Sequence, residues 1–336
     1  MKSTLLLILA AAAFAAAPTY KIVGTIKIGG AARWDYSYFD AANHRLYVSH
    51  GTQTEVVDTS TEKLIRNIPG TNGVHGIAIA NDLGRGFTSN GADNEVLAFD
   101  LKTLMPVSSL GTNGKIKAGQ NPDAIIYEPV THRVFTFNGR SKDGTAIDAK
   151  TGNVIAASIA FGGKPEFAQV DGKGHIYVNI EDKNEIVDID ARTAMISKRF
   201  PIEPCDAPTG MAIDTKKSRL YSVCSNKLMV VSDFKTGKVL GSAAIGVGTD
   251  GVVLDDGYAF ASNGRDRNIT MVGETAAGKF EPVATIPTQF GARTIAVDPK
   301  AHKLYLPASE VGAPNPEKGK NPAPVPDSFQ IVVVGR

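Results

Sequence analysis

Residues 210–246 read GMAIDTKKSRLYSVCSNKLMVVSDFKTGKVLGSAAIG, and this stretch shows the pattern that decides the fold. An apolar run from Gly210 to Asp214 is followed by a turn and by an aromatic-led run from Leu220 to Val223. A third apolar run ends at Asp233, which opens a D-x-x-T turn with Thr236 before a more polar segment. An Asp at this position can accept hydrogen bonds from backbone N–H groups two or three residues later. The stretch therefore predicts four short strands joined by tight turns.

The same pattern recurs with a period of about 43 residues along the chain. Units start near residues 34, 74, 122, 165, 208, 249 and 292, and the second residues of these units are 40, 48, 43, 43, 41 and 43 positions apart. The D-x-x-T turn recurs at Asp58, Asp100, Asp148, Asp190 and Asp233. No segment shows a convincing helical period. We therefore predict an all-β chain that forms one seven-bladed β-propeller domain over residues 18–336, with four strands in each blade.

The two ends of the repeat array complement each other. The segment from Lys21 to Gly29 resembles a fourth strand, whereas the last unit ends in its third strand at Phe329 to Val334. We predict that these two segments pair antiparallel and close the last blade, because closure removes free strand edges. A Pro-rich insertion at 310–328 separates the second and third strands of that blade. It is expected on the face of the channel mouth, as a lid, a partner-docking arm or a loop without a role.

The first residues indicate export. Lys2 precedes an apolar stretch from Leu5 to Phe14 and several small residues, which predicts a signal peptide over residues 1–17 and a periplasmic or secreted protein. The apolar run is shorter than a membrane anchor requires, so no membrane span is expected after its removal. The 36 basic and 34 acidic residues leave a formal charge of +2, which makes nucleic acid an unfavoured partner.

Several second strands share a motif with a known family. Phe87-Thr88-Ser89-Asn90-Gly91 and Phe260-Ala261-Ser262-Asn263-Gly264 resemble the Y-V-T-N repeat of bacterial YVTN or YncE-like β-propellers. The segments Tyr221 to Cys224 and Tyr305 to Ala308 depart from it. The resemblance implies the fold over essentially the whole mature chain. It does not imply one function, because similar propellers serve as binding proteins, as subunits and occasionally as enzymes.

The repeat also predicts where a site lies. First strands line the central channel of a propeller, so the second residues of the seven units should surround one channel mouth. These residues are Asp35, His75, Asp123, Glu166, Thr209, Asp250 and Arg293. The ends of the second strands are expected to add His50, Asn90, Asn138 and Asn263. Charged residues at the start of apolar strands are the ligand-binding candidates, since stability alone would accept small or apolar residues there. The alternative is that they only solvate the mouth or cap backbone groups.

These side chains include two sets of metal ligands. Carboxylates with asparagine carbonyls suit calcium, and imidazole with carboxylates suits zinc. The candidate metal ligands are Glu166, Asp250, Asn90, Asn138 and Asn263. Their composition is loosely similar to the axial metal site of the gluconolactonase and senescence-marker propellers. A Cys-x-x-Cys-His sequence is absent, so covalent haem is not expected.

Two classes of function follow. The favoured hypothesis is an exported, non-catalytic binding or scaffold propeller that recognises a small ligand, a metal ion or a periplasmic protein partner at its polar mouth. The alternative is a divalent-metal-dependent hydrolase or lyase of lactone-like substrates, with the metal on the propeller axis. The sequence identifies neither the ligand nor the cofactor.

The two cysteines, Cys205 and Cys224, flank the start of one unit and should both reach the mouth face. In an oxidising compartment they are expected to form a disulfide. The alternative is a pair of thiolates that binds copper or zinc.

Overall fold

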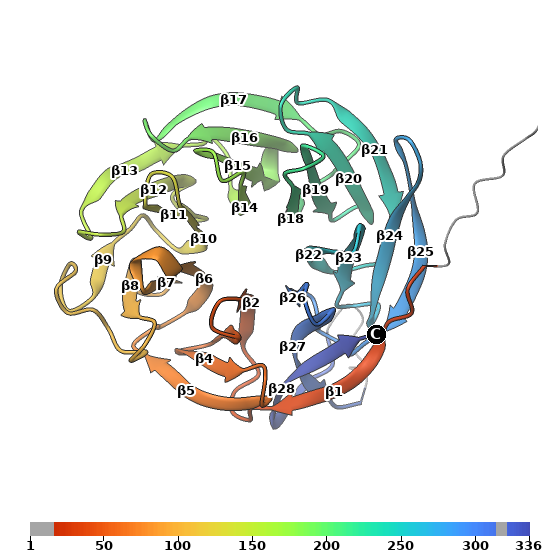
Figure 1. Ribbon diagram of the computed structural model, residues 1–336, viewed down its shortest axis with the longest axis horizontal. Helices are drawn as coiled ribbons and strands as arrows, with labels where there is room; N and C mark the ends of the chain where they lie inside the picture. Colours follow the sequence, from red (N-terminus) through yellow and green to blue (C-terminus); the bar gives the residue numbers. More distant parts are fainter. Residues whose placement is uncertain (1–16, 314–320) are drawn as a thin grey trace, which may run out of the picture.

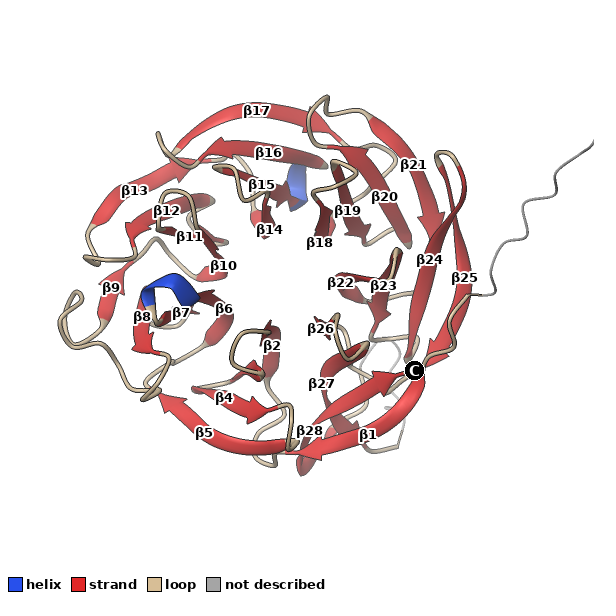
Figure 2. Cartoon of the chain, viewed as in Figure 1, coloured by secondary structure: helices blue, strands red, loops and turns tan. Residues whose placement is uncertain are grey.

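The computed structural model describes residues 17–313 and 321–336. Seven four-stranded antiparallel sheets surround a central channel (Figure 1). Six of them run outward from the channel in strand order, and the seventh has the order β26-β27-β28-β1. Strands make up almost all the regular structure, with two short 3-10 helices, η1 (Asn81–Leu83) and η2 (Glu181–Lys183) (Figure 2). The predicted seven-bladed β-propeller is confirmed. The predicted signal peptide lies almost entirely outside the described residues.

The strand bounds follow the repeat. Blades one to three comprise β2 (Trp34–Asp40), β3 (Arg45–His50), β4 (Gln53–Asp58) and β5 (Lys63–Pro69); β6 (Val74–Ala80), β7 (Arg85–Asn90), β8 (Glu95–Asp100) and β9 (Lys115–Lys117); and β10 (Pro122–Glu128), β11 (Arg133–Asn138), β12 (Asp143–Asp148) and β13 (Val154–Ala160). Blades four and five comprise β14 (Pro165–Val170), β15 (His175–Ile180), β16 (Glu185–Asp190) and β17 (Met195–Pro201); and β18 (Pro208–Asp214), β19 (Arg219–Cys224), β20 (Leu228–Asp233) and β21 (Val239–Ala244). Blades six and seven comprise β22 (Thr249–Asp255), β23 (Tyr258–Asn263), β24 (Asn268–Ala276) and β25 (Lys279–Pro287); and β26 (Ala296–Asp298), β27 (Lys303–Val311), β28 (Pro324–Gly335) and β1 (Lys21–Lys27).

The core lies between neighbouring blades. Phe135 and Phe137 of blade three are fully buried in one cluster with Val178 and Val187 of blade four. A single blade offers an apolar face to each neighbour and cannot bury both alone, so the ring is the unit that folds. The D-x-x-T turns have the predicted geometry. Asp58 Oδ1, for example, accepts hydrogen bonds from the backbone N–H groups two and three residues later, at 2.8 and 3.0 Å.

The N-terminal strand closes the ring as predicted. β1 is the outermost strand of blade seven and pairs antiparallel with β28, so that Lys21 lies opposite Gly335 and Lys27 lies opposite Gln330. Figure 1 shows the red N-terminal strand beside the blue C-terminal strand. The two ends of the chain are therefore joined by a backbone ladder, and blade seven has the four strands of the other blades.

Blade seven departs from the repeat in two places. Its first strand, β26, begins only at Ala296. The Arg293 carbonyl, before this strand, accepts from the backbone N–H of Asp250 in blade six at 3.2 Å. The Pro-rich insertion is also partly strand. β27 and β28 extend into it, with Val311 paired opposite Pro324, and residues 314–320 lie outside the described part. In residues 17–313 and 321–336, no helix has the length and hydropathy needed to cross a membrane.

Candidate functional site

A β-bulge near the start of the first strand redirects the side chains at the mouth. Trp34 is paired with His50, but Ser37 is paired with Val48, so β2 carries one extra residue between these pairs. The same one-residue shift occurs in β6, β10, β14, β18 and β22. A bulge re-aims the side chains beside it. The extra residue therefore accounts for the repeated placement of a polar side chain at the start of an otherwise apolar strand.

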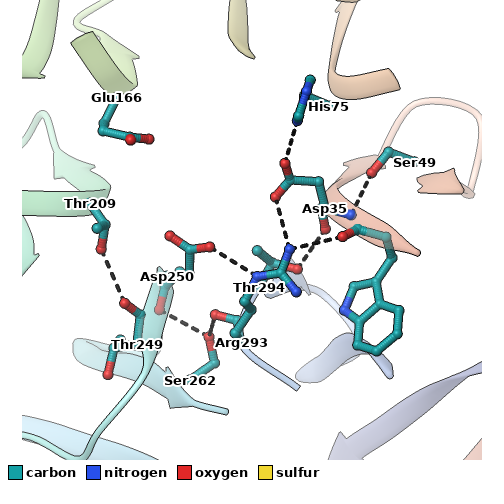
Figure 3. A network of polar contacts seen from close by, with 12 residues as sticks. Asp35, Ser49, His75, Glu166, Thr209, Thr249, Asp250, Ser262, Arg293 and Thr294 are labelled. Atoms are coloured by element: carbon teal, nitrogen blue, oxygen red, sulfur yellow. Dashed lines mark hydrogen bonds and ion pairs between the residues drawn. The ribbon is translucent and has the colours of Figure 1, made fainter. Parts of the chain in front are cut away.

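Arg293 links the two ends of the ring at this mouth. Its Nε donates to Asp250 Oδ2 at 3.1 Å, and its Nη2 donates to the carbonyl of Trp34 at 2.9 Å and lies 3.5 Å from Asp35 Oδ1. Its guanidinium also lies over the Trp34 ring, 5.8 Å from the centroid. Figure 3 shows the guanidinium between the two carboxylates. The two carboxylates hold the pKa of Arg293 above its ordinary value, although burial opposes them.

Blades one, two and three bring Asp35, His75 and Asp123 together. His75 Nδ1 lies 2.6 Å from Asp35 Oδ2 and 3.6 Å from Asp123 Oδ1. The three side chains are only 18%, 24% and 16% exposed, respectively. Burial lowers the pKa of His75, but the hydrogen bond to Asp35 and the charges of both carboxylates outweigh it and raise the pKa.

The carboxylate of Asp123 forms no close ion pair within the described residues; His75 Nδ1 lies 3.6 Å from its Oδ1 atom. Burial, followed by the charge of Asp35, raises its pKa to about 7. Its Oδ1 atom is shielded from solvent and accepts no hydrogen bond from any described residue. Buried polar atoms in native proteins almost always have a partner, so this oxygen needs a physical explanation.

Glu166 and Asp250 lie across the mouth from this group. Lys164 Nζ donates to the carboxylates of both Glu166 and Glu181. Burial and the charge of Asp123 raise the pKa of Glu166 to about 8, and Lys164 offsets only part of the effect. Burial and the charge of Asp35 also raise the pKa of Asp250, with Arg293 opposing them. Several carboxylates therefore repel one another in a poorly solvated space.

The remaining first-strand candidate, Thr209, has a structural contact. Its Oγ1 donates to the backbone carbonyl of Thr249 in the next blade, at 3.1 Å. This bond ties blade five to blade six at the mouth.

The second-strand candidates do not join the group at the mouth. His50, the last residue of β3, is buried, with Nδ1 2.7 Å from Glu55 and its ring stacked on Phe329. Asn90, Asn138 and Asn263 are completely buried. The Nδ2 atom of Asn138 donates to Asp143 at 2.8 Å, for example.

These positions correct the expectation of a second polar ring. Second strands lie one strand farther from the axis, and the three asparagines at their ends bond within their own blades. His50 instead contacts Glu55 of its own blade and Phe329 of blade seven. The predicted five-residue metal set is therefore not assembled: Glu166 and Asp250 lie at the channel, but Asn90, Asn138 and Asn263 do not.

Three residues at the mouth, Lys164, Tyr36 and Phe167, were not predicted from the sequence. Lys164 directly precedes β14, and Tyr36 and Phe167 occupy the position after the polar residue, where the other blades have Gly, Ala or Thr. The rings of Tyr36 and Phe167 meet edge to face, 5.2 Å apart, beneath the polar group. Both also line an apolar cavity of about 210 Å³ deeper in the channel. Two aromatic residues in a column of small ones were a signal in the sequence that these positions fill the channel.

The cysteines are joined on the mouth face. Cys205, in the loop before β18, forms a disulfide with Cys224 at the end of β19, and each residue is 2% exposed. With both sulfur atoms in this bond, the structure does not present the thiolate pair of the alternative hypothesis.

Comparisons with known proteins support the fold. No protein-family model matches this chain, and no curated protein matches it in sequence. A chain of hydrazine synthase from Kuenenia stuttgartiensis is similar in structure, with a TM-score of 0.70 and 14% identity over 84% of this chain and 94% of its own. A chain of the mitotic checkpoint complex is similar with a TM-score of 0.75 and 10% identity, over 100% of this chain and 99% of its own. At these identities the similarity shows the propeller fold alone.

Proposed function

We propose that this chain is an exported, non-catalytic binding propeller that takes a small cationic ligand at its channel mouth. The electrostatic balance of the mouth supports this function. Four carboxylates, those of Asp35, Asp123, Glu166 and Asp250, face three basic side chains, those of Arg293, Lys164 and His75. Lys164 is also shared with Glu181. Repulsion among these carboxylates and their burial raise the pKa values of Asp123, Glu166 and Asp250, and a bound cation would relieve that repulsion in exchange for protons.

The observation that carries the proposal is the unpaired carboxylate of Asp123. Arg293 contacts Asp35 and Asp250, and Lys164 contacts Glu166. Among residues 17–313 and 321–336, the one basic side chain within 4 Å of the Asp123 carboxylate is His75, at 3.6 Å. The Oδ1 atom of Asp123 is shielded from solvent and accepts no hydrogen bond from the described residues. A cation bound against this oxygen would supply the missing partner.

Export and family are part of the same proposal. The charged and apolar start of the chain supports a signal peptide, and the motif around Phe87 supports membership of the YVTN or YncE-like propellers. We propose no second function, because the asparagines of the lactone-hydrolase hypothesis bond within their own blades.

Thermal unfolding of the mature protein tests the proposed function. The probes are the chlorides of Mg²⁺, Ca²⁺, Mn²⁺ and Zn²⁺, together with tetramethylammonium and spermidine; the sodium salts of citrate and phosphate serve as anionic controls. A ligand at 100 times its Kd stabilises a protein by about 2.7 kcal/mol. For a domain of this size, that corresponds to a rise in Tm of about 4 °C.

Charge-neutral variants locate the binding. The double variant Asp123→Asn/Asp250→Asn should abolish the cation-dependent rise in Tm. The matched control is Glu203→Gln, which removes an exposed carboxylate near the disulfide. The control should keep the full rise. If no cation raises Tm, or if the rise survives in the double variant, the proposed function is wrong.

A further inference from the structure

Three side chains at the mouth have the composition and spacing of a metal site. Asp35, His75 and Asp123 come from consecutive blades, and one ligand atom from each lies within 4.8 Å of the others. Ligand atoms around a tetrahedral ion at about 2.0 Å are separated by about 3.3 Å. The distances from His75 Nδ1 to the two carboxylate oxygens, 2.6 and 3.6 Å, bracket this separation. Small side-chain movements would therefore place all three atoms around one ion.

Neighbouring groups already orient the ligands. The Arg293 guanidinium lies 3.5 Å from Asp35 Oδ1, which leaves Oδ2 directed at His75. Ser49 Oγ accepts from the backbone N–H of Asp35 at 2.9 Å, and Ser89 Oγ donates to the backbone carbonyl of Asp123. Such contacts around a site fix the direction of its ligands and raise its affinity.

Gly91 leaves the space that the imidazole occupies. A Cβ atom on Gly91 would lie only 2.7 Å from Nε2 and 2.8 Å from Cδ2 of His75. A side chain at this position would therefore require the His75 ring and the nearby Asn121 side chain to shift. The absence of a side chain at Gly91 therefore allows the His75 ring to take its position.

We infer that Asp35, His75 and Asp123 bind one divalent transition-metal ion. This inference rests on the proposed function and names the class of its ligand. An imidazole nitrogen with two carboxylate oxygens suits zinc, cobalt or manganese better than calcium or magnesium, which prefer oxygen ligands alone. Two carboxylates balance the double charge of the ion, and the unpaired Oδ1 of Asp123 gains a partner. None of the three ligands belongs to the five-residue set predicted from the sequence.

Cobalt binding to metal-stripped mature protein tests the inference. Titration with Co²⁺ should produce visible absorption bands that saturate at one equivalent, and Zn²⁺ should abolish these bands by competition. Gel filtration followed by elemental analysis should find one Zn²⁺ per chain. His75→Gln and Asp123→Asn should each weaken binding of Co²⁺ by about 100-fold or more, and Gly91→Ala by about 10-fold.

Two control variants test whether weaker Co²⁺ binding is specific to this site or follows from the loss of any histidine or any negative charge. His132 forms a similar pair with Asp82, with Nδ1 2.9 Å from Oδ2, so His132→Gln is the matched control for His75→Gln. Glu203→Gln is the control for removal of one negative charge. Both should bind Co²⁺ within about 3-fold of the wild type, and circular dichroism should show that all variants retain the strand spectrum.

The outcomes distinguish the inference from the proposed function. Absence of saturable Co²⁺ binding, or binding that His75→Gln and Asp123→Asn leave unchanged, overturns the metal site. If tetramethylammonium or spermidine still raises Tm in a manner that depends on Asp123 and Asp250, the proposed function stands while the metal site falls. If no cation of either kind binds, both are overturned.

Discussion

Removal of the disulfide between Cys205 and Cys224 should destabilise the propeller by an amount that can be worked out from the chain. The two cysteines are 19 positions apart. In the chain-entropy model, closing a loop of this size is worth about 3 kcal/mol at 25 °C, because it restricts the unfolded chain. Both residues are 2% exposed, so Cys205→Ala/Cys224→Ala also loses packing worth about 1 kcal/mol. The total of about 4 kcal/mol corresponds to a fall in Tm of about 6 °C for a domain of this length.

Urea unfolding at 25 °C separates the two contributions. The oxidised protein is compared with the same protein reduced by TCEP and with the double alanine variant. Reduction should cost only the entropic part, the double variant should lose both parts, and TCEP should not affect the double variant. A loss below about 1 kcal/mol on reduction would refute the reasoning that the bond constrains the unfolded chain. Intact mass of protein taken directly from the periplasm provides a second check, since two free thiols would contradict the bond.

Three further predictions concern closure, pH and export. Deletion of residues 20–29 removes β1 and exposes the edge of β28, so we expect aggregation or loss of cooperative unfolding; a monomer that melts like the full mature chain would contradict this. The Arg219 guanidinium lies 2.6 Å from Glu274 and holds the pKa of that carboxyl at about 2, below its ordinary 4.5. The ion pair therefore stabilises the fold fully above pH 4.5, and this contribution disappears as the pH falls towards 2. Glu274→Gln should therefore cost about 1–2 kcal/mol at pH 7, after allowance for solvent screening, and the difference from wild type in urea unfolding should shrink steadily between pH 5 and pH 3; a difference that does not depend on pH would refute the assignment. Finally, the full chain expressed in a Gram-negative host should be released by osmotic shock with a mass that begins near residue 16 to 18, and retention of the full-length mass in the cytoplasm would contradict export.

The sequence was sufficient for the architecture because each blade is encoded locally. The D-x-x-T turns, exemplified by Asp58, and the aromatic-led second strands recur at a nearly constant spacing, which sets the number of blades. The resemblance of the N-terminal segment to a fourth strand was enough to predict closure. The first-strand positions of the mouth could also be read, since a charge at the start of an apolar strand repeats in register from unit to unit.

Only the tertiary structure decided which of the mouth residues contact one another. The one-residue bulge at Asp35 and its equivalents changes which face of the strand a side chain occupies, and no single-strand pattern reveals such a shift. The same limit applies to His50 and Asn138: their position at strand ends was predictable, but their buried contacts with Glu55 and Asp143 were not. Arg293 contacts Asp35 from 258 positions away because the ring closes. The local pattern thus determines the blades, whereas the contacts across the channel depend on side-chain directions and on closure of the whole ring.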